Sequence, residues 1–298
     1  MSSKNYKATE KIGGIFDSTV FDEASTVWIN VPYCSSDGHM GNIDNDEIGY
    51  VFRGHEIVKA VLNTVQDRYG VGAGDVVVWG GASAGARGAM VHLDYVSEFF
   101  SDSKVVGILD SPLWVDLDPP EWSDSIGLLE QTKQVYEISG VGAVSGPDGV
   151  VTEDCASAHE GEEYKCLFGQ YRMPFVSPPH LLISSEFDSF QLGEDGLSIP
   201  FDEKANEYAD SFGAKMHSVF LNLTEIPAQN ASLYSQPCYN HAISMSSKYF
   251  TSSTRSGVTL DDAVAIFMES PLGFSDLTDY CEEGFSSCTS DGSKCSYK

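Results

Sequence analysis

The sequence lacks several features that define whole classes of protein. No apolar run approaches the roughly 18 residues that a membrane-spanning helix needs, and residues 1–14 have no apolar core of the signal-peptide kind. Basic residues are few, with 17 Lys and Arg against 44 Asp and Glu and a net charge of −27. Nucleic-acid binding depends on basic residues, so this charge argues against a nucleic-acid partner. It also disfavours close approach to a polyanionic polysaccharide.

Motifs that hold nucleotides and metals are missing as well. The chain contains no G-x-G-x-x-G fingerprint, and no Lys follows the glycines of residues 80–88 as it does in a P-loop. No two cysteines are spaced as C-x-x-C, the usual mark of a zinc site. We therefore expect neither a cofactor nor a metal.

Cysteine, by contrast, is well represented, and its distribution indicates disulfides. Most of the seven cysteines lie in the C-terminal half, and three fall in a Cys-rich tail over 275–298. This usage is typical of an oxidising compartment, and the sequons at Asn222 and Asn230 agree with a secreted or cell-wall protein. The odd count leaves one cysteine without a partner in the chain. The cysteines are Cys34, Cys155, Cys166, Cys238, Cys281, Cys288 and Cys295.

The pattern of apolar residues predicts strands that alternate with helices. Such alternation implies crossover connections and a mostly parallel sheet flanked by helices, an α/β fold that we expect to form one domain over 1–298. Gly70 should stop the first helix, whose apolar stripe is Ile57, Val61 and Val65. Strands are predicted at 26–33, 76–79, 104–110, 180–186 and 216–223, and helices at 50–70, 84–100, 201–212 and 241–250.

One long segment does not fit this alternation. Residues 139–179 are rich in glycine and polar side chains, which is unusual for a core layer. We expect them to cover the top of the sheet as a lid, with Cys155 and Cys166 closing a loop within it.

The stretch VVVWGGASAGARG over 76–88 carries the strongest chemical signal. Its Gly81-Ala82-Ser83-Ala84-Gly85 fits G-x-S-x-G between a predicted strand and a predicted helix. A nucleophilic serine on such a turn needs small neighbours, and the Ala84 N–H at the helix N-terminus would face a developing oxyanion. The alternative is an ordinary glycine-rich turn without catalytic meaning.

A serine nucleophile also needs a histidine base and an acid that orients it. In this fold the chain order is Ser, acid, His, with the last two on loops after strands. Asp188 follows a predicted strand directly, and Glu186 and Asp110 are its rivals. His241 comes after the last predicted strand, which favours it. The other histidines precede, interrupt or sit inside predicted elements: His39, His55, His92, His159, His180 and His217.

Six segments occur in a distinctive order along the chain: NVPYCSSDGHMGN (30–42), GASAGARG (81–88), DSPLW (110–114), CASAHEGEEYKCLFGQYRMP (155–174), SSEFDSFQL (184–192) and CYNHAIS (238–244). Together they resemble the pectin acetylesterase and Notum-type carboxylesterase family. This resemblance covers about residues 13–250 and implies an α/β-hydrolase-like fold that cleaves carboxylic esters through a serine acyl-enzyme. It implies Ser83 as nucleophile, Asp188 as acid and His241 as base.

Two departures from the family pattern shape the expectation. A GGGWC-like stretch that supplies oxyanion donors would precede the part matching residue 13, so we expect an N-terminally incomplete chain in which Cys34 is unpaired. Ala82 replaces the Cys or Ser of many relatives. The leading hypothesis is a serine esterase that removes acetyl groups from a polysaccharide. A non-catalytic hydrolase-like binding protein and a Notum-like lipid deacylase remain as alternatives.

Overall fold

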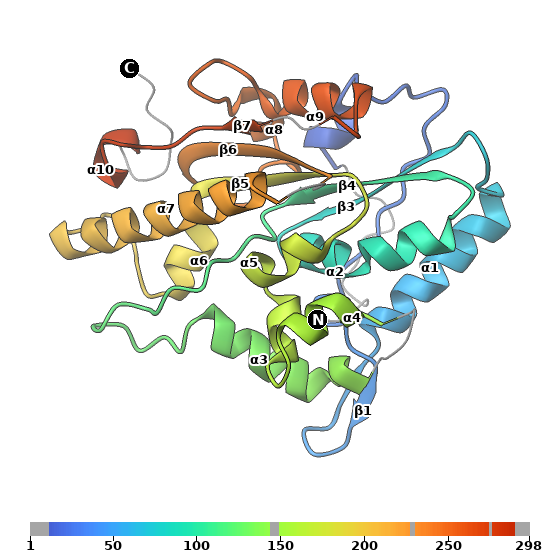
Figure 1. Ribbon diagram of the computed structural model, residues 1–298, viewed down its shortest axis with the longest axis horizontal. Coiled ribbons are helices and arrows are strands. Elements are labelled where there is room, and N and C mark those ends of the chain that lie inside the picture. Colours follow the sequence, from blue (N-terminus) through green and yellow to red (C-terminus); the bar gives the residue numbers. More distant parts are fainter. Residues whose placement is uncertain (1–11, 144–148, 227–229, 274–275, 290–298) are drawn as a thin grey trace.

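A five-stranded sheet forms the centre of the protein (Figure 1). The computed structural model describes residues 12–143, 149–226, 230–273 and 276–289. The strand order is β3-β4-β5-β6-β7, and every neighbouring pair is parallel, which confirms the expected α/β architecture. The strands are β3 (Val76–Ala82), β4 (Lys104–Asp110), β5 (His180–Asp188), β6 (Ala231–Asn240) and β7 (Asp276–Thr278).

Helices cover both faces of the sheet (Figure 1). One face packs on α2 (Ala84–Phe99) and α7 (Glu203–Thr224), with α1 (Gly54–Tyr69) alongside α2, and the other on α8 (Lys248–Thr251) and α9 (Leu260–Glu269). The remaining elements are η2 (Gly14–Asp17), β1 (Ile43–Asn45), β2 (Tyr50–Phe52), α3 (Leu128–Ser139), η3 (Val141–Ala143), α4 (Glu153–Ala158), η4 (Glu163–Leu167), α5 (Gly169–Arg172), η5 (Met173–Phe175), α6 (Ser189–Glu194) and α10 (Phe285–Cys288).

The strands separate the core into two layers because their side chains alternate between faces. In β4, Val105 and Leu109 join the cluster on the α2 and α7 side, whereas Val106 and Ile108 join the cluster on the α9 side. Every residue of β5 is buried, as expected for the middle strand of a covered parallel sheet. Burying one such aliphatic side chain contributes about 1.5–3 kcal/mol, so the sheet is held firmly from both sides.

The strand predicted at 26–33 is wrong. This segment has no regular secondary structure, and Val27, Trp28 and Ile29 are exposed. Their apolar character suggested a core strand. In the structure the Trp28 ring instead packs against the rings of Phe16 and Phe21. Strand formation depends on a neighbouring strand, and within the described residues none pairs with this segment.

The strand predicted at 216–223 is also wrong, because these residues continue α7. The buried positions recur at helical spacing along one face, and the true last long strand, β6, was not predicted. Pro237 and the polar residues of β6 concealed it, since proline is uncommon in central strands. The buried residues of α7 are Ala205, Ala209, Phe212, Gly213, Met216, Val219, Phe220 and Leu223.

Two helix predictions need correction. Most of 241–250 is turn, and only the short α8 forms near its end. The first helix begins at Gly54 rather than at residue 50, because Tyr50–Phe52 form β2. It stops at Gly70, as predicted, with Gly70 in the left-handed conformation at φ 63°. Its buried face, however, runs through Val58 and Leu62 rather than the predicted stripe, because the partner surface of α2 selects the neighbouring side of the helix.

The segment after α3 is polar in composition and yet contributes to the core. Val150, Leu167 and Met173 are buried in the main cluster, so the sparse apolar residues of this segment are used for packing. The predicted Cys155–Cys166 disulfide is present. Residues 144–148, which belong to the predicted lid, lie outside the described residues.

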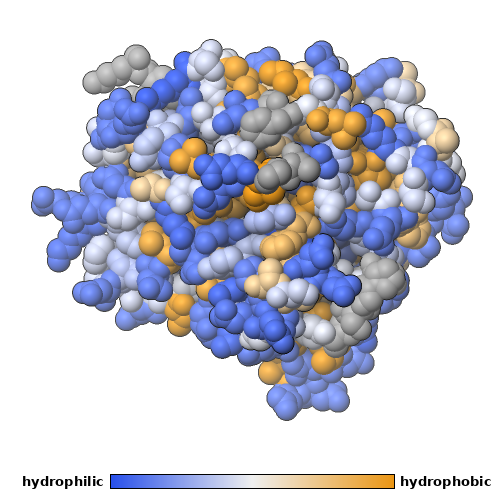
Figure 2. All heavy atoms as spheres, in the orientation of Figure 1, coloured by the Kyte–Doolittle hydropathy of each residue, from blue (hydrophilic) through white to orange (hydrophobic). Residues whose placement is uncertain are grey.

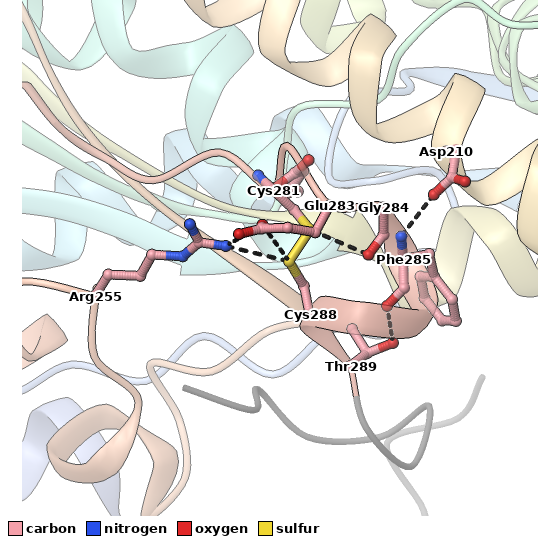
Figure 3. Close-up of a disulfide and its surroundings, with 9 residues drawn as sticks. Asp210, Arg255, Cys281, Glu283, Gly284, Phe285, Cys288 and Thr289 are labelled. Carbon is pink, nitrogen blue, oxygen red and sulfur yellow. Dashed lines mark hydrogen bonds and ion pairs between the residues drawn. A yellow bond between two sulfur atoms is a disulfide. The ribbon is translucent and has the colours of Figure 1, made fainter. Parts of the chain in front are cut away.

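The other cysteines agree with the expected disulfide usage. Cys281 and Cys288 form a disulfide beside α10 (Figure 3), and Cys238 in β6 is disulfide-bonded. Cys34 is a free cysteine, as expected. Cys295 lies outside the described residues.

The surface reflects the acidic composition. In Figure 2, hydrophilic residues dominate the face shown, with hydrophobic residues in separate patches between them. Among the described residues, no helix combines the length and apolar character needed to cross a membrane.

Candidate active site

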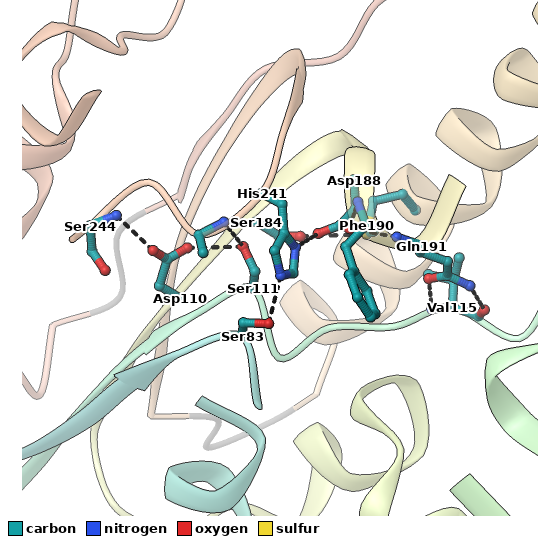
Figure 4. Close-up of polar contacts among 12 residues, drawn as sticks. Ser83, Asp110, Ser111, Val115, Ser184, Asp188, Phe190, Gln191, His241 and Ser244 are labelled. Carbon is teal, nitrogen blue, oxygen red and sulfur yellow. Dashed lines mark hydrogen bonds and ion pairs between the residues drawn. The ribbon is translucent and has the colours of Figure 1, made fainter. Parts of the chain in front are cut away.

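The site lies where neighbouring strands of the sheet end. β3 and β4 finish in register, with Ala82 opposite Asp110, and β5 and β6 finish with Asp188 opposite Asn240. The residues that follow these ends therefore meet at the carboxyl edge of one parallel sheet, the usual place for ligands in such folds. Four polar side chains gather there: Ser83, Ser111, Asp188 and His241 (Figure 4).

Ser83 occupies a strained turn between β3 and α2. Its φ of 57° and ψ of −124° are unusual for a residue with a side chain, and such strain clusters at functional sites. The turn brings residues 81 and 85 so close that a Cβ on Gly81 would lie 2.4 Å from the carbonyl carbon of Gly85. The expectation that the turn needs small residues beside Ser83 is therefore confirmed at Gly81.

His241 links Ser83 to Asp188 (Figure 4). Its Nε2 lies 2.7 Å from the Ser83 Oγ, and its Nδ1 lies 2.7 Å from the Asp188 Oδ2. These three side chains are separated by as many as 158 positions in the chain, yet they form one continuous hydrogen-bonded line. With Nδ1–H donating to the carboxylate, Nε2 is left free to accept the serine proton.

Asp188 is held by the start of α6. Its Oδ1 accepts the N–H groups of Phe190 and Gln191, both at 2.9 Å, as an N-cap does. Gln191 is itself fixed, because its side chain bonds both the N–H and the C=O of Val115 at 3.0 and 2.6 Å. The carboxylate, which is fully buried, therefore has one oxygen left for the imidazole.

The environment of His241 favours its protonated form. Burial by itself would lower the pKa, but the hydrogen bond and charge of Asp188, with a smaller contribution from the charge of Asp110, raise it above the ordinary value. Phe190 stacks on the imidazole, with ring centroids 5.1 Å apart. The ring is thus confined between an aromatic face and the line of hydrogen bonds.

The two other candidate acids, Glu186 and Asp110, do not hydrogen-bond to the His241 imidazole. The Oε2 of Glu186 accepts the N–H of Cys281 at 2.9 Å, and this carboxyl lies beside the C-terminal disulfide. Asp110 is near the site, but its carboxylate bonds Ser111 and the Ser244 N–H rather than the imidazole.

The rival histidines serve packing. His55 and His92 contact each other at 3.2 Å between α1 and α2, and burial lowers the pKa of His92 to about 3. His180 is fully buried at the start of β5, and the His217 ring stacks on Tyr280. A base must reach the nucleophile, and among the described histidines His241 does so.

Ala84 is the first residue of α2, so its N–H has no acceptor within the helix and can donate to a bound group.

The sequence analysis missed the residues that support the site, because Ser111, Phe190 and Gln191 have no distinctive spacing. A signal existed in the segments DSPLW and SSEFDSFQL, because polar residues that follow directly after strands tend to reach the carboxyl edge.

The chain is similar in sequence to several palmitoleoyl-protein carboxylesterases. The chain is 26% identical to palmitoleoyl-protein carboxylesterase notum1a of Danio rerio, with 89% of this chain and 53% of that protein covered. It is 28% identical to palmitoleoyl-protein carboxylesterase NOTUM of Mus musculus at the same coverage. The chain thus spans about half the length of these relatives.

The fold is similar to a solved structure of the Wnt deacylase Notum from Drosophila, with a TM-score of 0.78 and 21% identity over 100% of this chain and 83% of that one. At this identity the similarity establishes the fold. Residues 1–283 match the family described as Pectinacetylesterase. This match covers nearly the whole chain, and the chain therefore belongs to the pectinacetylesterase family.

Proposed function

We propose that the protein is a serine esterase that hydrolyses short acyl esters, with acetyl groups on a polysaccharide as the preferred substrate. The observation that carries the proposal is the line of hydrogen bonds from Ser83 through His241 to Asp188. Membership of the pectinacetylesterase family supports the same chemistry. The disulfides support action in an oxidising, extracellular setting.

The reaction follows from the positions of the atoms. The Ser83 Oγ attacks the ester carbonyl while His241 Nε2 takes its proton, and the Ala84 N–H donates to the oxygen that becomes negative. The tetrahedral intermediate collapses, and the imidazolium gives the proton to the departing alcohol. A water molecule then attacks the acyl-serine by the same route, which releases the acid and restores the Ser83 hydroxyl.

The surroundings of Ser83 favour a short acyl group. Arg87 lies one helical turn after Ser83 and is buried, and its guanidinium is 3.9 Å from the centroid of the Trp114 ring. Trp114 in turn stacks on Phe190, which stacks on His241. Because these side chains pack directly against one another beside the imidazole, they leave less room for a long hydrocarbon chain than for an acetyl group.

The charge of −27 favours a neutral sugar chain over a polyuronate. An acetylated neutral polysaccharide is therefore the substrate class that we propose, and the family's name does not by itself establish pectin as the substrate.

The test compares acyl chain lengths in wild type and in Ser83→Ala. We expect p-nitrophenyl acetate to be cleaved faster than the octanoate ester, and Ser83→Ala to lose at least about 1,000-fold in turnover while it keeps its melting temperature. Ser101→Ala, which alters an exposed serine after α2, serves as the matched control.

Three results would count against the proposal. Hydrolysis that survives in Ser83→Ala would show that Ser83 is not the nucleophile. Failure of a fluorophosphonate probe to label folded wild type would favour a non-catalytic binding protein. A preference for the octanoate ester would favour the deacylation of lipid-modified protein that the names of the relatives describe.

A further inference from the structure

A second buried carboxylate lies beside the proposed triad. Asp110 ends β4 and is 1% exposed. Its Oδ2 accepts the N–H of Ser244 at 2.7 Å, and its Oδ1 accepts the hydroxyl of Ser111 at 2.9 Å. The Ser111 Oγ accepts the N–H of Ala242 at 3.0 Å (Figure 4). Two backbone amides within three residues after His241 are therefore held by the side chains of Asp110, at the end of β4, and of Ser111, which follows it.

The same two residues also hold the turn of the nucleophile. The carbonyl oxygen of Asp110 accepts the N–H of Ser83 at 2.8 Å, and the N–H of Ser111 donates to the carbonyl of Ile183 in β5 at 2.8 Å. The turn that carries the serine and the loop that carries the histidine are thus joined through one dipeptide.

Backbone strain accompanies this arrangement. Ser111 has a φ of 62° and Ala242 a φ of 53°, values that are uncommon for residues with a side chain. Each such conformation costs on the order of 1–3 kcal/mol and persists only where the surroundings enforce it. At Ser111 the strained backbone places the hydroxyl between the Asp110 carboxylate and the Ala242 amide.

We propose that Asp110 and Ser111 are a positioning pair that fixes His241 against Ser83, and that the Asp110 carboxylate also stabilises the imidazolium formed when Ser83 loses its proton. The proposal rests on the esterase function proposed above. Ser111 carries no charge and acts on His241 through geometry, whereas Asp110 acts through geometry and charge, so the two contributions are separable.

The charges around His241 support the electrostatic part. Asp188 faces the imidazole from the end of β5 and Asp110 from the end of β4, and the phenol of Tyr239 in β6 faces Asp188. Burial raises the pKa of Asp110, and the hydrogen bonds from Ser244 and Ser111 oppose that rise. Because Asp110 accepts both bonds, its ionised form is the one that the surroundings satisfy.

The experiment uses Asp110→Asn and Ser111→Gly in the full chain. The titration of the His241 imidazole is followed by nitrogen-15 NMR, and kcat and KM for p-nitrophenyl acetate are measured against pH. In Asp110→Asn we expect the imidazole midpoint to fall by about 0.5–1 pH unit, the acid limb of kcat to move by the same amount, and kcat to drop about 10- to 100-fold with little change in KM.

Ser111→Gly separates positioning from stability. Glycine tolerates the positive φ, so the melting temperature should stay the same or rise, while the lost contact to Ala242 should lower kcat about 10-fold without moving the imidazole midpoint. An unchanged midpoint in Asp110→Asn would overturn the electrostatic role. An unchanged kcat in Ser111→Gly would overturn the positioning role.

The design keeps this proposal distinct from the function on which it rests. The NMR midpoint needs no turnover, so a wild type without esterase activity would contradict the proposed function while the imidazole shift still tests Asp110. Should Asp110→Asn not fold, the ratio of kcat between Ser111→Gly and wild type decides the positioning role by itself.

Discussion

Phe190 lies against the imidazole of His241, with their rings inclined by 28°. Its other neighbour in the stack is Trp114, whose ring plane is inclined by 15° to that of Phe190. The face of the imidazole is therefore covered by a stack of rings, and its two nitrogens are held by Asp188 and Ser83. Removal of the phenyl ring should free the imidazole to rotate.

We expect Phe190→Ala to lower kcat for p-nitrophenyl acetate several-fold, and the lost ring contact to destabilise the fold by about 0.5–1.5 kcal/mol. Phe250→Ala is a matched control, because Phe250 is 39% exposed against 38% for Phe190 and makes an edge-to-face ring contact with Tyr249 rather than with His241. Equal kcat values in the two variants would contradict a role for the phenyl ring at the imidazole.

The backbone turn at Ser83 leads to a prediction about two glycines. A Cβ on Gly81 would lie 2.4 Å from the Gly85 carbonyl carbon, whereas a Cβ on Gly85 would have no neighbour within 4 Å. Gly81→Ala should therefore lose several degrees in melting temperature, measured by calorimetry. Gly85→Ala should keep or gain stability, since alanine is favoured over glycine in a helix by about 1 kcal/mol. Equal melting temperatures would contradict the contact.

Glu186 predicts how stability depends on pH. Burial, and to a lesser extent the charges of Asp210 and Asp279, raise its pKa to about 8, although the Cys281 N–H and Arg255 act in the opposite direction. A carboxyl with a raised folded pKa favours the folded state fully below its unfolded pKa of 4.5, and this contribution is lost as the pH rises through about 8.

Glu186→Gln should therefore flatten the decline in melting temperature between pH 5 and about 9, an effect on the order of a few kcal/mol at most. The amide oxygen can still accept the Cys281 N–H. The exposed neighbour Glu282→Gln is the control and should behave as wild type does. A decline as steep in Glu186→Gln as in wild type would show that Glu186 is not responsible.

The Cys155–Cys166 disulfide gives a prediction with an internal control. It joins residues 11 apart, and the double variant Cys155→Ser, Cys166→Ser should lose roughly 2–3 kcal/mol in the free energy of unfolding by urea. Cys34→Ser changes a free cysteine and should leave that free energy within about 0.5 kcal/mol of wild type. Equal losses in both variants would contradict a stabilising disulfide.

The parts of the fold that were predictable are those whose signals are local. Strand β4 was predicted with its observed bounds, because its apolar, strand-favouring residues Val105, Val106, Ile108 and Leu109 stand between two polar segments. Gly70 ended its helix as predicted, since a left-handed conformation favours glycine. The turn at Ser83 was recognised because a strand, small residues and a helix follow one another directly.

The errors arose where contacts with distant parts of the chain, rather than the local sequence, decide the structure. The apolar residues of 216–223 satisfy a strand or a helix equally well over so short a run, and the buried face shared with α7 decides for the helix. Segment 26–33 is apolar but exposed, so its character gave no information about a partner strand. The contacts of Asp110 and Ser111 with residues 242–244 join positions more than 130 apart, and no local pattern reports them.

The Ser83 turn and the His241 loop are both attached to the same end of β4. The distance between the Ser83 hydroxyl and the His241 imidazole therefore does not depend on the length of the chain that follows β4. The connection between β4 and β5, which holds α3 and the segment with Cys155, emerges beyond this anchorage. Insertions or deletions there can reshape what surrounds the hydroxyl and still leave its spacing from the imidazole unchanged. Under the esterase function proposed above, substrate preference can thus diverge among homologues while the Ser83 hydroxyl and the His241 imidazole keep their places.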